Sequence, residues 1–208
     1  MSTDAAASVD TRLTRKGQAT RARIVAAASE LMFERGVTAT GIDDVKAAAG
    51  VSSSQLYHYF ADKHALISAV VAHQTEQVLC AQEPLLSQLD SFEALRLWRD
   101  FIVDTQRQRE CRGGCPIGSL ASELSERDPQ NRYALATAFD RWEDGIRAGL
   151  QRMHERGELC ANADPNGLAL ATLAALQGGL LLTQVRRSTA PLEAALDEML
   201  AHIEAQSA

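Results

Sequence analysis

The chain is poor in several residue types, and each scarcity excludes a class of protein. Its 208 residues include four cysteines and five prolines, and aromatic residues make up only 5%. Four scattered cysteines without an apolar leader argue against a disulfide framework. No apolar run approaches the roughly 20 residues that cross a bilayer, and the small, polar residues 1–10 do not form a secretory signal. We therefore expect a cytoplasmic protein with no membrane partner.

The chain also lacks the patterns of common enzyme sites. It has no glycine-rich phosphate loop, no Gly-x-Ser-x-Gly and no His-Glu-x-x-His. Acidic pairs such as Glu143-Asp144 fall in amphipathic segments, where they are typical of solvated helix faces. We expect no enzymatic activity, no cofactor and no metal site.

The net charge of −6 is unevenly distributed. Residues 1–63 carry eight Lys or Arg and seven Asp or Glu, a net of +1, whereas residues 64–208 carry 13 and 20, a net of −7. A basic stretch near the N-terminus suffices for phosphate contacts, because a DNA duplex responds to local charge. A solvated arm without a partner explains the stretch equally well. It consists of Arg12, Arg15, Lys16, Arg21 and Arg23.

Apolar residues recur at helical spacing along almost the whole chain, and strand-like alternation is absent. Glycines end several segments, and a proline or a capping residue such as Thr40, Ser52 or Asp62 begins most of them. The pattern predicts an all-α fold of about nine helices. Their expected ranges are 18–35, 42–49, 53–59, 63–80, 92 to the glycine pair at 113–114, 117–125, 129–156, 165–187 and 191–205.

Two short predicted helices meet at residues 48–51, Ala-Ala-Gly-Val. Small side chains allow the two backbones to approach closely, and Gly50 permits a sharp turn between them. A helix-turn-helix needs this arrangement, because its second helix must project into a major groove about 12 Å wide.

Residues 18–71 resemble the DNA-binding domain of the TetR family of regulators. The matching phrases are AAASELMF at 26–33, GVTAT at 36–40, AAGVS at 48–52, LYHYF at 56–60 and DKHAL at 62–66. The resemblance implies a disordered basic arm over 1–17, a three-helix helix-turn-helix domain over 18–63, and a helical ligand-binding and dimerisation bundle over 64–208. It further implies a sequence-specific DNA-binding regulator. The expected form is a homodimeric repressor on an inverted-repeat operator, released by a small, largely apolar effector.

The resemblance assigns roles at individual positions. Ser53 and Gln55 are the expected base readers, since glutamine can bond adenine N6 and N7 as a pair. Thr40 and Lys63 are expected to hold phosphates near helix N-termini. Many relatives carry a basic residue where this chain has Ser53, so binding should depend on the arm and Lys63 for charge. The full predicted set is Thr40, Ser52, Ser53, Ser54, Gln55, Tyr57, His58, Tyr59 and Lys63.

An effector cavity needs apolar walls with a few polar groups. Candidates in the middle helices, each of which could instead simply fill the core, are Trp98, Phe101, Ile102, Phe139, Trp142, Gln177, Leu181 and Gln184. Two glycines at 178–179 lie within a long helix at a cost of about 1 kcal/mol each, which close packing or room for a ligand would explain. The last two helices, with Leu196 and Leu200 among their apolar residues, are the expected dimer face.

The segment GGCPIGSLASEL at 113–124 resembles a phrase in some TetR-type regulators, certain of which sense electrophiles through cysteine. Cys115 would precede a helix whose dipole lowers a thiol pKa, and Cys111 is four residues away. An inert thiol is the simpler interpretation of both residues. The alternative function is a thiol-sensing or partner-controlled DNA-binding regulator.

Overall fold

The computed structural model describes residues 13–208, and nine α-helices lie within that range. The only β-type pairing in those residues is a single isolated bridge between Leu159 and Ser207. The all-α prediction is therefore confirmed. The chain divides into two compact units, Met1–His73 and Gln74–Ala208. This division falls inside a helix and later than the predicted boundary between residues 63 and 64.

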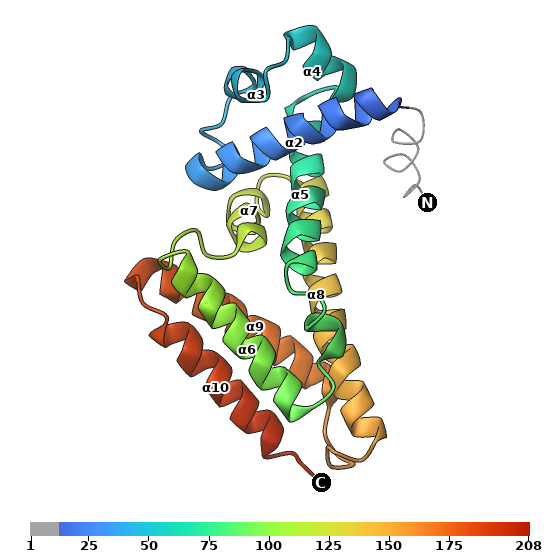
Figure 1. Cartoon of the computed structure of the whole chain (residues 1–208), viewed down its shortest axis with the longest axis vertical. Coiled ribbons are helices and arrows are strands. Elements are labelled where there is room, and N and C mark those ends of the chain that lie inside the picture. The colour runs from blue at the N-terminus through green and yellow to red at the C-terminus, as the bar shows by residue number, and fades with distance from the viewer. Residues whose placement is uncertain (1–12) are drawn as a thin grey trace. The chain divides into compact units, whose positions relative to one another are not determined.

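The first unit contains α2 (Arg15–Arg35), α3 (Ile42–Ala49), α4 (Ser53–Tyr59) and the first part of α5 (Lys63–Cys80) (Figure 1). Helix α2 packs against α3. Asp62 accepts a hydrogen bond from the Ala65 amide at 2.8 Å, as expected of a residue that caps α5. The small core of this unit is formed by Ile24, Ala28, Met32, Val45, Ala49, Leu56, Phe60, Leu66 and Val70.

Helix α2 begins three residues earlier than predicted. Thr14 caps it, since its side-chain oxygen accepts a hydrogen bond from the Gly17 amide at 3.2 Å. Arg15 and Lys16 are thus helical, which corrects the expectation that the disordered arm extends to residue 17. Arg12 and the rest of the predicted arm lie outside the described residues.

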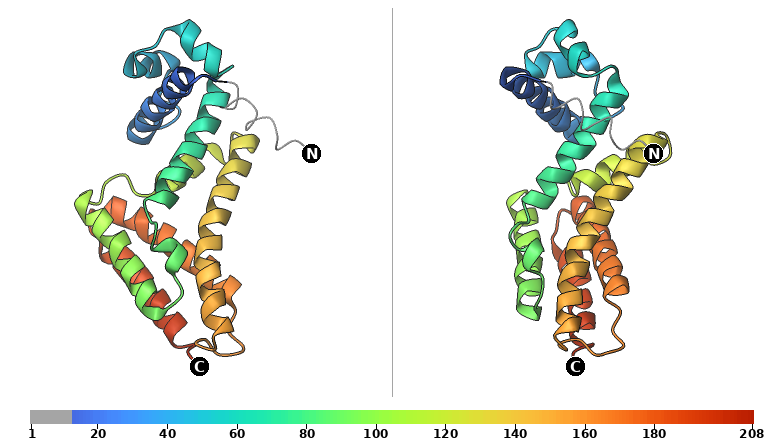
Figure 2. Two further views of the ribbon diagram at one scale, coloured as in Figure 1. Left: turned by 45° about the vertical axis from the view of Figure 1, so that its right-hand side comes forward. Right: turned by 90° about the vertical axis from the view of Figure 1, so that its right-hand side faces the viewer.

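The second unit contains η1 (Leu86–Gln88), α6 (Phe92–Gln108), α7 (Pro116–Leu124), α8 (Pro129–Glu155), α9 (Pro165–Arg186) and α10 (Ala190–Glu204). Helix α9 packs against α8 and α10, and α10 also packs against α6 (Figure 2). Ser91, Asp128 and Asp164 cap α6, α8 and α9 through their side-chain oxygens, as their sequences predict. Proline then occupies the first turn of α8 and α9.

Gly179 allows α9 to approach α10 closely. A β-carbon at this position would lie 2.9 Å from Cα of Leu192 and 3.0 Å from its side chain. The close packing offsets the low helix propensity of this glycine. Gly178 is different, because it is exposed and a β-carbon there would meet nothing within 4 Å.

Charged residues join α6 to α10 along their exposed edges. Arg99 forms a bidentate ion pair with Asp197 at 2.7 and 2.9 Å, and Arg107 pairs with Glu193 at 2.6 Å. Arg96 and Glu204 form a third pair at 2.6 Å. All three cations belong to α6 and all three acids to α10, so the two helices are matched in charge as well as in apolar packing.

Helix α9 has the length and composition of a membrane span, with a mean hydropathy of 1.6 over its most apolar window. This corrects the expectation that no segment approaches such a length. Within the second unit, 44% of that window is buried, and a core helix of a soluble protein passes the same test.

Candidate nucleic-acid interface and cavities

Helices α3 and α4 are joined by a short turn at Gly50. Its φ of 61° lies in the left-handed region, and its amide bonds the carbonyl oxygens of Ala47 and Lys46. Ser52 then caps α4 by accepting from the Gln55 amide at 3.2 Å, while Oε1 of Gln55 accepts from the Ser52 amide at 2.9 Å. This reciprocal capping box fixes the direction in which α4 starts.

One side of α4 is exposed and polar, and the other side is buried. Leu56 and Phe60 are 0% and 2% exposed and anchor the helix in the core. Tyr57 is 53% exposed although it is large and aromatic. The exposed surface contains six of the predicted DNA contacts: Ser52, Ser53, Ser54, Gln55, Tyr57 and His58.

Gln55 has a structural role that the sequence analysis did not assign to it. Its side-chain oxygen is already the acceptor in the capping box, whereas pairing with adenine uses both the oxygen and the nitrogen of the amide. Tyr59 is half-buried beside His58, with ring centroids 4.9 Å apart, and its phenol lies near Gly17 of α2.

Thr40 does not occupy the place that the sequence predicts. It is 1% exposed, and its hydroxyl donates to the Gly36 carbonyl oxygen at 2.8 Å. The residue that caps α3 is Gly41, whose amide donates to the Asp44 carboxylate at 2.9 Å. The predictions that Thr40 caps this helix and presents its side chain to a phosphate are therefore corrected.

Lys63 lies at the start of α5, as predicted, but it is half-buried. Its ammonium group donates to the Val37 carbonyl oxygen at 3.0 Å. In this arrangement Lys63 ties α5 to the segment between α2 and α3. Its charge is thus only partly available to a phosphate.

Lys46 is a cation that the sequence analysis missed. Its ammonium nitrogen lies 2.8 Å from Oγ of Ser53 and 2.6 Å from the Asp43 carboxylate. The hydrogen bond and charge of Lys46 lower the pKa of Asp43. Lys46 thus places a positive charge next to Ser53, where the family often has a basic side chain. The sequence could have indicated this role, because Lys46 lies in the last helical turn before Gly50. A helix-turn-helix places that turn next to the start of the following helix.

Two arginines of the predicted basic stretch make structural contacts at the surface of the first unit. Nε of Arg23 donates to the Ala49 carbonyl at the end of α3, at 2.9 Å. The Arg21 guanidinium stacks over the Phe60 ring, 5.3 Å from its centroid. Both therefore have structural contacts in addition to any role at DNA.

The second unit contains two cavities that share Cys115 in their walls. The smaller, about 190 Å³, includes Phe101, Ile102 and Trp142 of the predicted cavity residues. The larger, about 670 Å³, includes Phe139, Gln177, Leu181 and Gln184. Trp98 lines neither, because it is fully buried and its indole N–H donates to Gln82 at 2.9 Å. Its assignment to an effector cavity is corrected.

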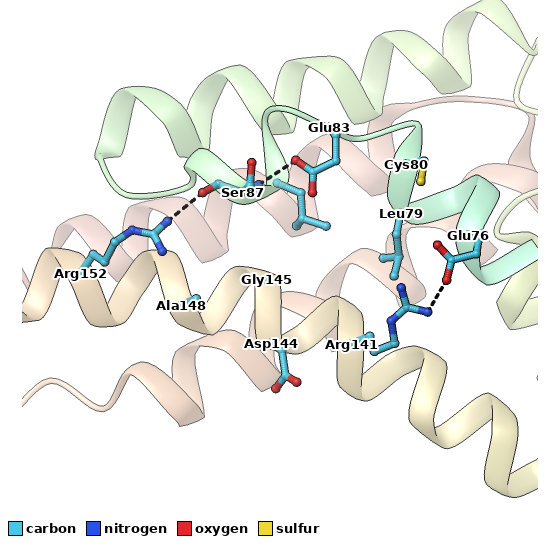
Figure 3. A pocket seen from close by; sticks show the side chains of 11 residues that line it. Glu76, Leu79, Cys80, Glu83, Ser87, Arg141, Asp144, Gly145, Ala148 and Arg152 are labelled. Atoms are coloured by element: carbon cyan, nitrogen blue, oxygen red, sulfur yellow. Dashed lines mark hydrogen bonds and ion pairs between the residues drawn. The ribbon is translucent and has the colours of Figure 1, made fainter. Parts of the chain in front are cut away.

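A third cavity, about 460 Å³, lies where the end of α5 and the η1 segment face α8, and no sequence pattern predicted it (Figure 3). Its charged groups largely satisfy one another. Arg141 pairs with Glu76 at 2.6 Å, and Arg152 donates to the Ser87 carbonyl oxygen at 3.0 Å. Paired charges leave little to recognise a ligand.

Cys115 is buried, and its Sγ accepts from the Gly118 amide at 3.4 Å as the cap of α7. Burial nevertheless raises the pKa of this thiol above its ordinary value, even though Gly118, Gln177 and Arg109 act in the opposite direction. This corrects the expectation of a lowered pKa. Cys111 is buried as well, and both thiols are free. Among residues 13–208, no three His, Cys, Asp or Glu side chains could hold a metal ion together.

Two family models match the chain, one over each unit. Residues 24–70 match the bacterial regulatory proteins of the tetR family. Residues 91–198 match the C-terminal domain of LmrA/YxaF-like transcriptional regulators.

Individual relatives agree with these matches over most of their length. The HTH-type transcriptional regulator Rv0196 of Mycobacterium tuberculosis is 31% identical, covering 85% of this chain and 90% of the relative. The repressor DhaR of a Mycobacterium species, strain GP1, is 25% identical over 83% of this chain and 86% of its own. A TetR transcriptional regulator from Chloroflexus aurantiacus has a solved structure that is 28% identical, with a TM-score of 0.80 over 93% of this chain and 98% of that one.

Proposed function

The chain belongs to the TetR family of helix-turn-helix transcriptional regulators, and we propose that it is a dimeric repressor that leaves an inverted-repeat operator when a small effector enters its second unit. DNA-binding regulation is the function of the family. The repressor role, the operator symmetry and the effector are the parts that we propose. The proposal places the protein in the cytoplasm, with the DNA that it binds.

The exposed side of α4 is the observation that carries the proposal. A surface helix whose buried side is held by Leu56 and Phe60 presents six hydrogen-bonding side chains outward. Lys46 adds a cation beside Ser53. Hydrogen-bonding groups on a projecting helix with adjacent positive charge are what major-groove recognition requires.

Helix α9 supports the dimer. Leu170, Leu181 and Val185 are 58%, 61% and 72% exposed, although they belong to a helix apolar enough to cross a membrane. Gly178 lies among them on the wall of the larger cavity, and within residues 13–208 a β-carbon there would meet nothing within 4 Å. A second copy packed on this stripe would bury the leucines and explain the glycine, as isologous helix pairs do in symmetric dimers.

The predicted dimer residues of α10 are corrected. Leu196 and Leu200 are 0% and 6% exposed, since they pack inside the second unit rather than on its surface. Helix α10 alone therefore offers little apolar surface to a partner, and the proposed interface moves to the exposed residues of α9.

Helix α5 supports coupling between effector and operator. It begins at Lys63 in the first unit, and its residues Gln74, Gln77 and Val78 form part of the wall of the smaller cavity. A ligand that prefers one arrangement of this wall acts on a helix continuous with the DNA-binding unit. A coupling of about 1–3 kcal/mol would change operator occupancy by one to two orders of magnitude.

Thiol chemistry is the alternative mechanism of release. Cys115 lines both cavities, so a reactive electrophile in either would meet its sulfur. Its burial and raised pKa nevertheless keep it in the unreactive thiol form. We therefore favour release by a non-covalent effector.

Selection from a pool of random duplexes tests the proposal without knowledge of the operator. The wild-type chain should enrich a sequence with two-fold symmetry, and footprinting should protect both halves. Tyr57→Ala should lose most of this specific binding. Tyr133→Ala is the matched control, because Tyr133 is 70% exposed but lies in the second unit. Recovery of unrelated sequences, or equal losses in the two variants, would contradict the proposal.

A further inference from the structure

The smaller cavity has a chemical feature that the larger cavity lacks. The residues of α5, α6, the segment between α6 and α7, α8 and α9 that line it all belong to the second unit. Among the described residues that line it, Arg109 is the only charged one. The described lining of the larger cavity contains no charged residue. The two cavities therefore suit different ligands.

Arg109 is a cation without a partner. Within residues 13–208 its guanidinium makes no ion pair or hydrogen bond, whereas Arg107, two residues earlier, pairs with both Asp104 and Glu193. Arg109 is exposed as well as part of the cavity wall, so its charge lies where the cavity meets solvent. An unpaired guanidinium at a cavity opening is suited to a carboxylate, which it can bind through two parallel hydrogen bonds.

Gln106 supplies a second, independent indication of a ligand. It is 4% exposed and lines the same cavity, and its side-chain oxygen has no hydrogen-bond donor. Buried polar atoms in folded proteins are almost always paired, so this orphaned acceptor, on a residue of the cavity wall, is available to a donor from a bound molecule. A ligand hydroxyl or N–H group would satisfy it.

The rest of the wall limits the size and polarity of the ligand. Ile102, Trp142 and Leu180 contribute apolar surface, and the cavity volume is about 190 Å³. This is below the range of 300–1,000 Å³ typical of cavities for drug-sized ligands. The occupant must be a small molecule with a short apolar body.

We propose that this cavity binds a small organic anion whose carboxylate pairs with Arg109, whose hydroxyl or N–H group donates to Oε1 of Gln106, and whose apolar body lies against Trp142. The proposal rests on the proposed function only in making this anion the effector, since binding can be measured without DNA.

Calorimetric titration of the full-length protein with a matched series of acids tests the proposal. The probes are butanoate, hexanoate and benzoate, their hydroxylated forms 4-hydroxybutanoate, 6-hydroxyhexanoate and 4-hydroxybenzoate, and the primary amide of each. We expect at least one hydroxylated acid to bind about tenfold or more tightly than its amide, because only the acid can form the charged pair. Its binding should also change the fluorescence of Trp142.

Substitutions at Arg109 and Gln106 test separately the proposed contacts of these two residues with the ligand. Arg109→Gln should weaken the acids about tenfold or more and leave the amides unchanged. Arg112→Gln is the matched control, because Arg112 lies three residues away, is exposed and lines neither cavity. Gln106→Met should remove the preference for hydroxylated over plain acids while preserving the preference for acids over amides.

The proposal is overturned if no acid of the series binds better than its amide, or if Arg109→Gln and Arg112→Gln behave alike. Operator release is a separate measurement. An acid that binds through Arg109 but leaves operator affinity unchanged would support the anion site and refute its role as effector. Failure to bind any operator would refute the proposed function and leave the titrations interpretable.

Discussion

Trp98 and Trp142 donate their indole N–H groups to the same atom, Oε1 of Gln82, at 2.9 and 3.1 Å. Gln82 is 3% exposed, and its side-chain nitrogen donates to the Val78 carbonyl oxygen at 2.9 Å. One buried amide therefore links α6 and α8 to the end of α5. Because both tryptophans of the chain bond this one amide, their fluorescence is sensitive to changes at Gln82.

Replacing Gln82 with leucine should destabilise the second unit. The substitution leaves two buried indole donors without an acceptor, and each such loss costs about 1–3 kcal/mol. We expect the free energy of unfolding in urea to fall by about 2–6 kcal/mol, with a shift in tryptophan emission. Gln88→Leu is the control, because Gln88 is exposed and should change stability by less than about 0.5 kcal/mol. Similar stability of the two variants would contradict the linking role of Gln82.

Gln55 permits its capping and DNA-reading roles to be separated. Glutamate preserves the capping box, since its carboxylate can accept from the Ser52 amide, but it cannot donate to adenine N7. We expect Gln55→Glu to keep thermal stability and lose about 1–3 kcal/mol of discrimination between operator and random DNA. Gln55→Ala should lose both discrimination and about 1 kcal/mol of stability. Unchanged discrimination in both variants would show that Gln55 only caps the helix.

Lys46 should contribute charge rather than sequence preference. We expect Lys46→Gln to weaken operator and random duplexes by the same factor and to reduce the dependence of log affinity on log salt by about one. Binding titrations at several salt concentrations measure both quantities. Lys63→Gln is the comparison, and its main effect should be lower thermal stability, because it removes the bond to Val37. A larger salt effect from Lys63 than from Lys46 would reverse these roles.

The proposed dimer face can be tested on α9. A carboxylate at Leu181 or Val185 would be buried unpaired in the interface, so Leu181→Glu and Val185→Glu should yield folded monomers by light scattering. Leu97→Glu should remain dimeric, because Leu97 is 53% exposed but belongs to α6. Dimers that survive both α9 substitutions would place the interface elsewhere.

Cys115 should react slowly with alkylating reagents. Its raised pKa leaves less thiolate at pH 7 than an ordinary cysteine has, and burial restricts access. Mass spectrometry after iodoacetamide treatment should show exposed Cys80 labelled well before Cys115. Because the folded-state pKa lies above the ordinary value of 9.0, the contribution of the neutral thiol to stability is present below that pH and declines above it. Cys115→Ala should flatten this decline, and labelling of Cys115 as fast as Cys80 would contradict its protection.

The local sequence predicted helices well because caps and breakers act over a few residues. Gly50, Ser91 and Asp128 each end or start a helix through bonds to residues within one turn. Thr40 was assigned wrongly because the neighbouring Gly41, with Asp44 three residues on, provides the cap instead. Both Thr40 and Gly41 can serve as an N-cap. The Thr40 side chain is buried and bonds the Gly36 carbonyl oxygen, so Gly41 caps the helix instead.

Features that depend on distant residues could not be predicted from periodicity. Leu196 and Leu181 look alike as apolar residues of helices, yet one is buried by α6 and α9 and the other is exposed. Arg23 looked like part of a basic arm, but it bonds a carbonyl 26 positions away. Similarly, Arg109 stands out among the arginines only because the structure places it in the wall of the smaller cavity.

The charge pairs between α6 and α10 have a consequence for synthesis. The paired residues are 86 to 108 positions apart, and among the described helices α10 is synthesised after α6 to α9. Until then α6 lacks its charge partners, and the core lacks Leu192 and Ile203. The second unit therefore completes its folding only after α10 has emerged from the ribosome. A premature stop near residue 190 should thus yield a chain that cellular proteases degrade, even though every helix before α10 has been made.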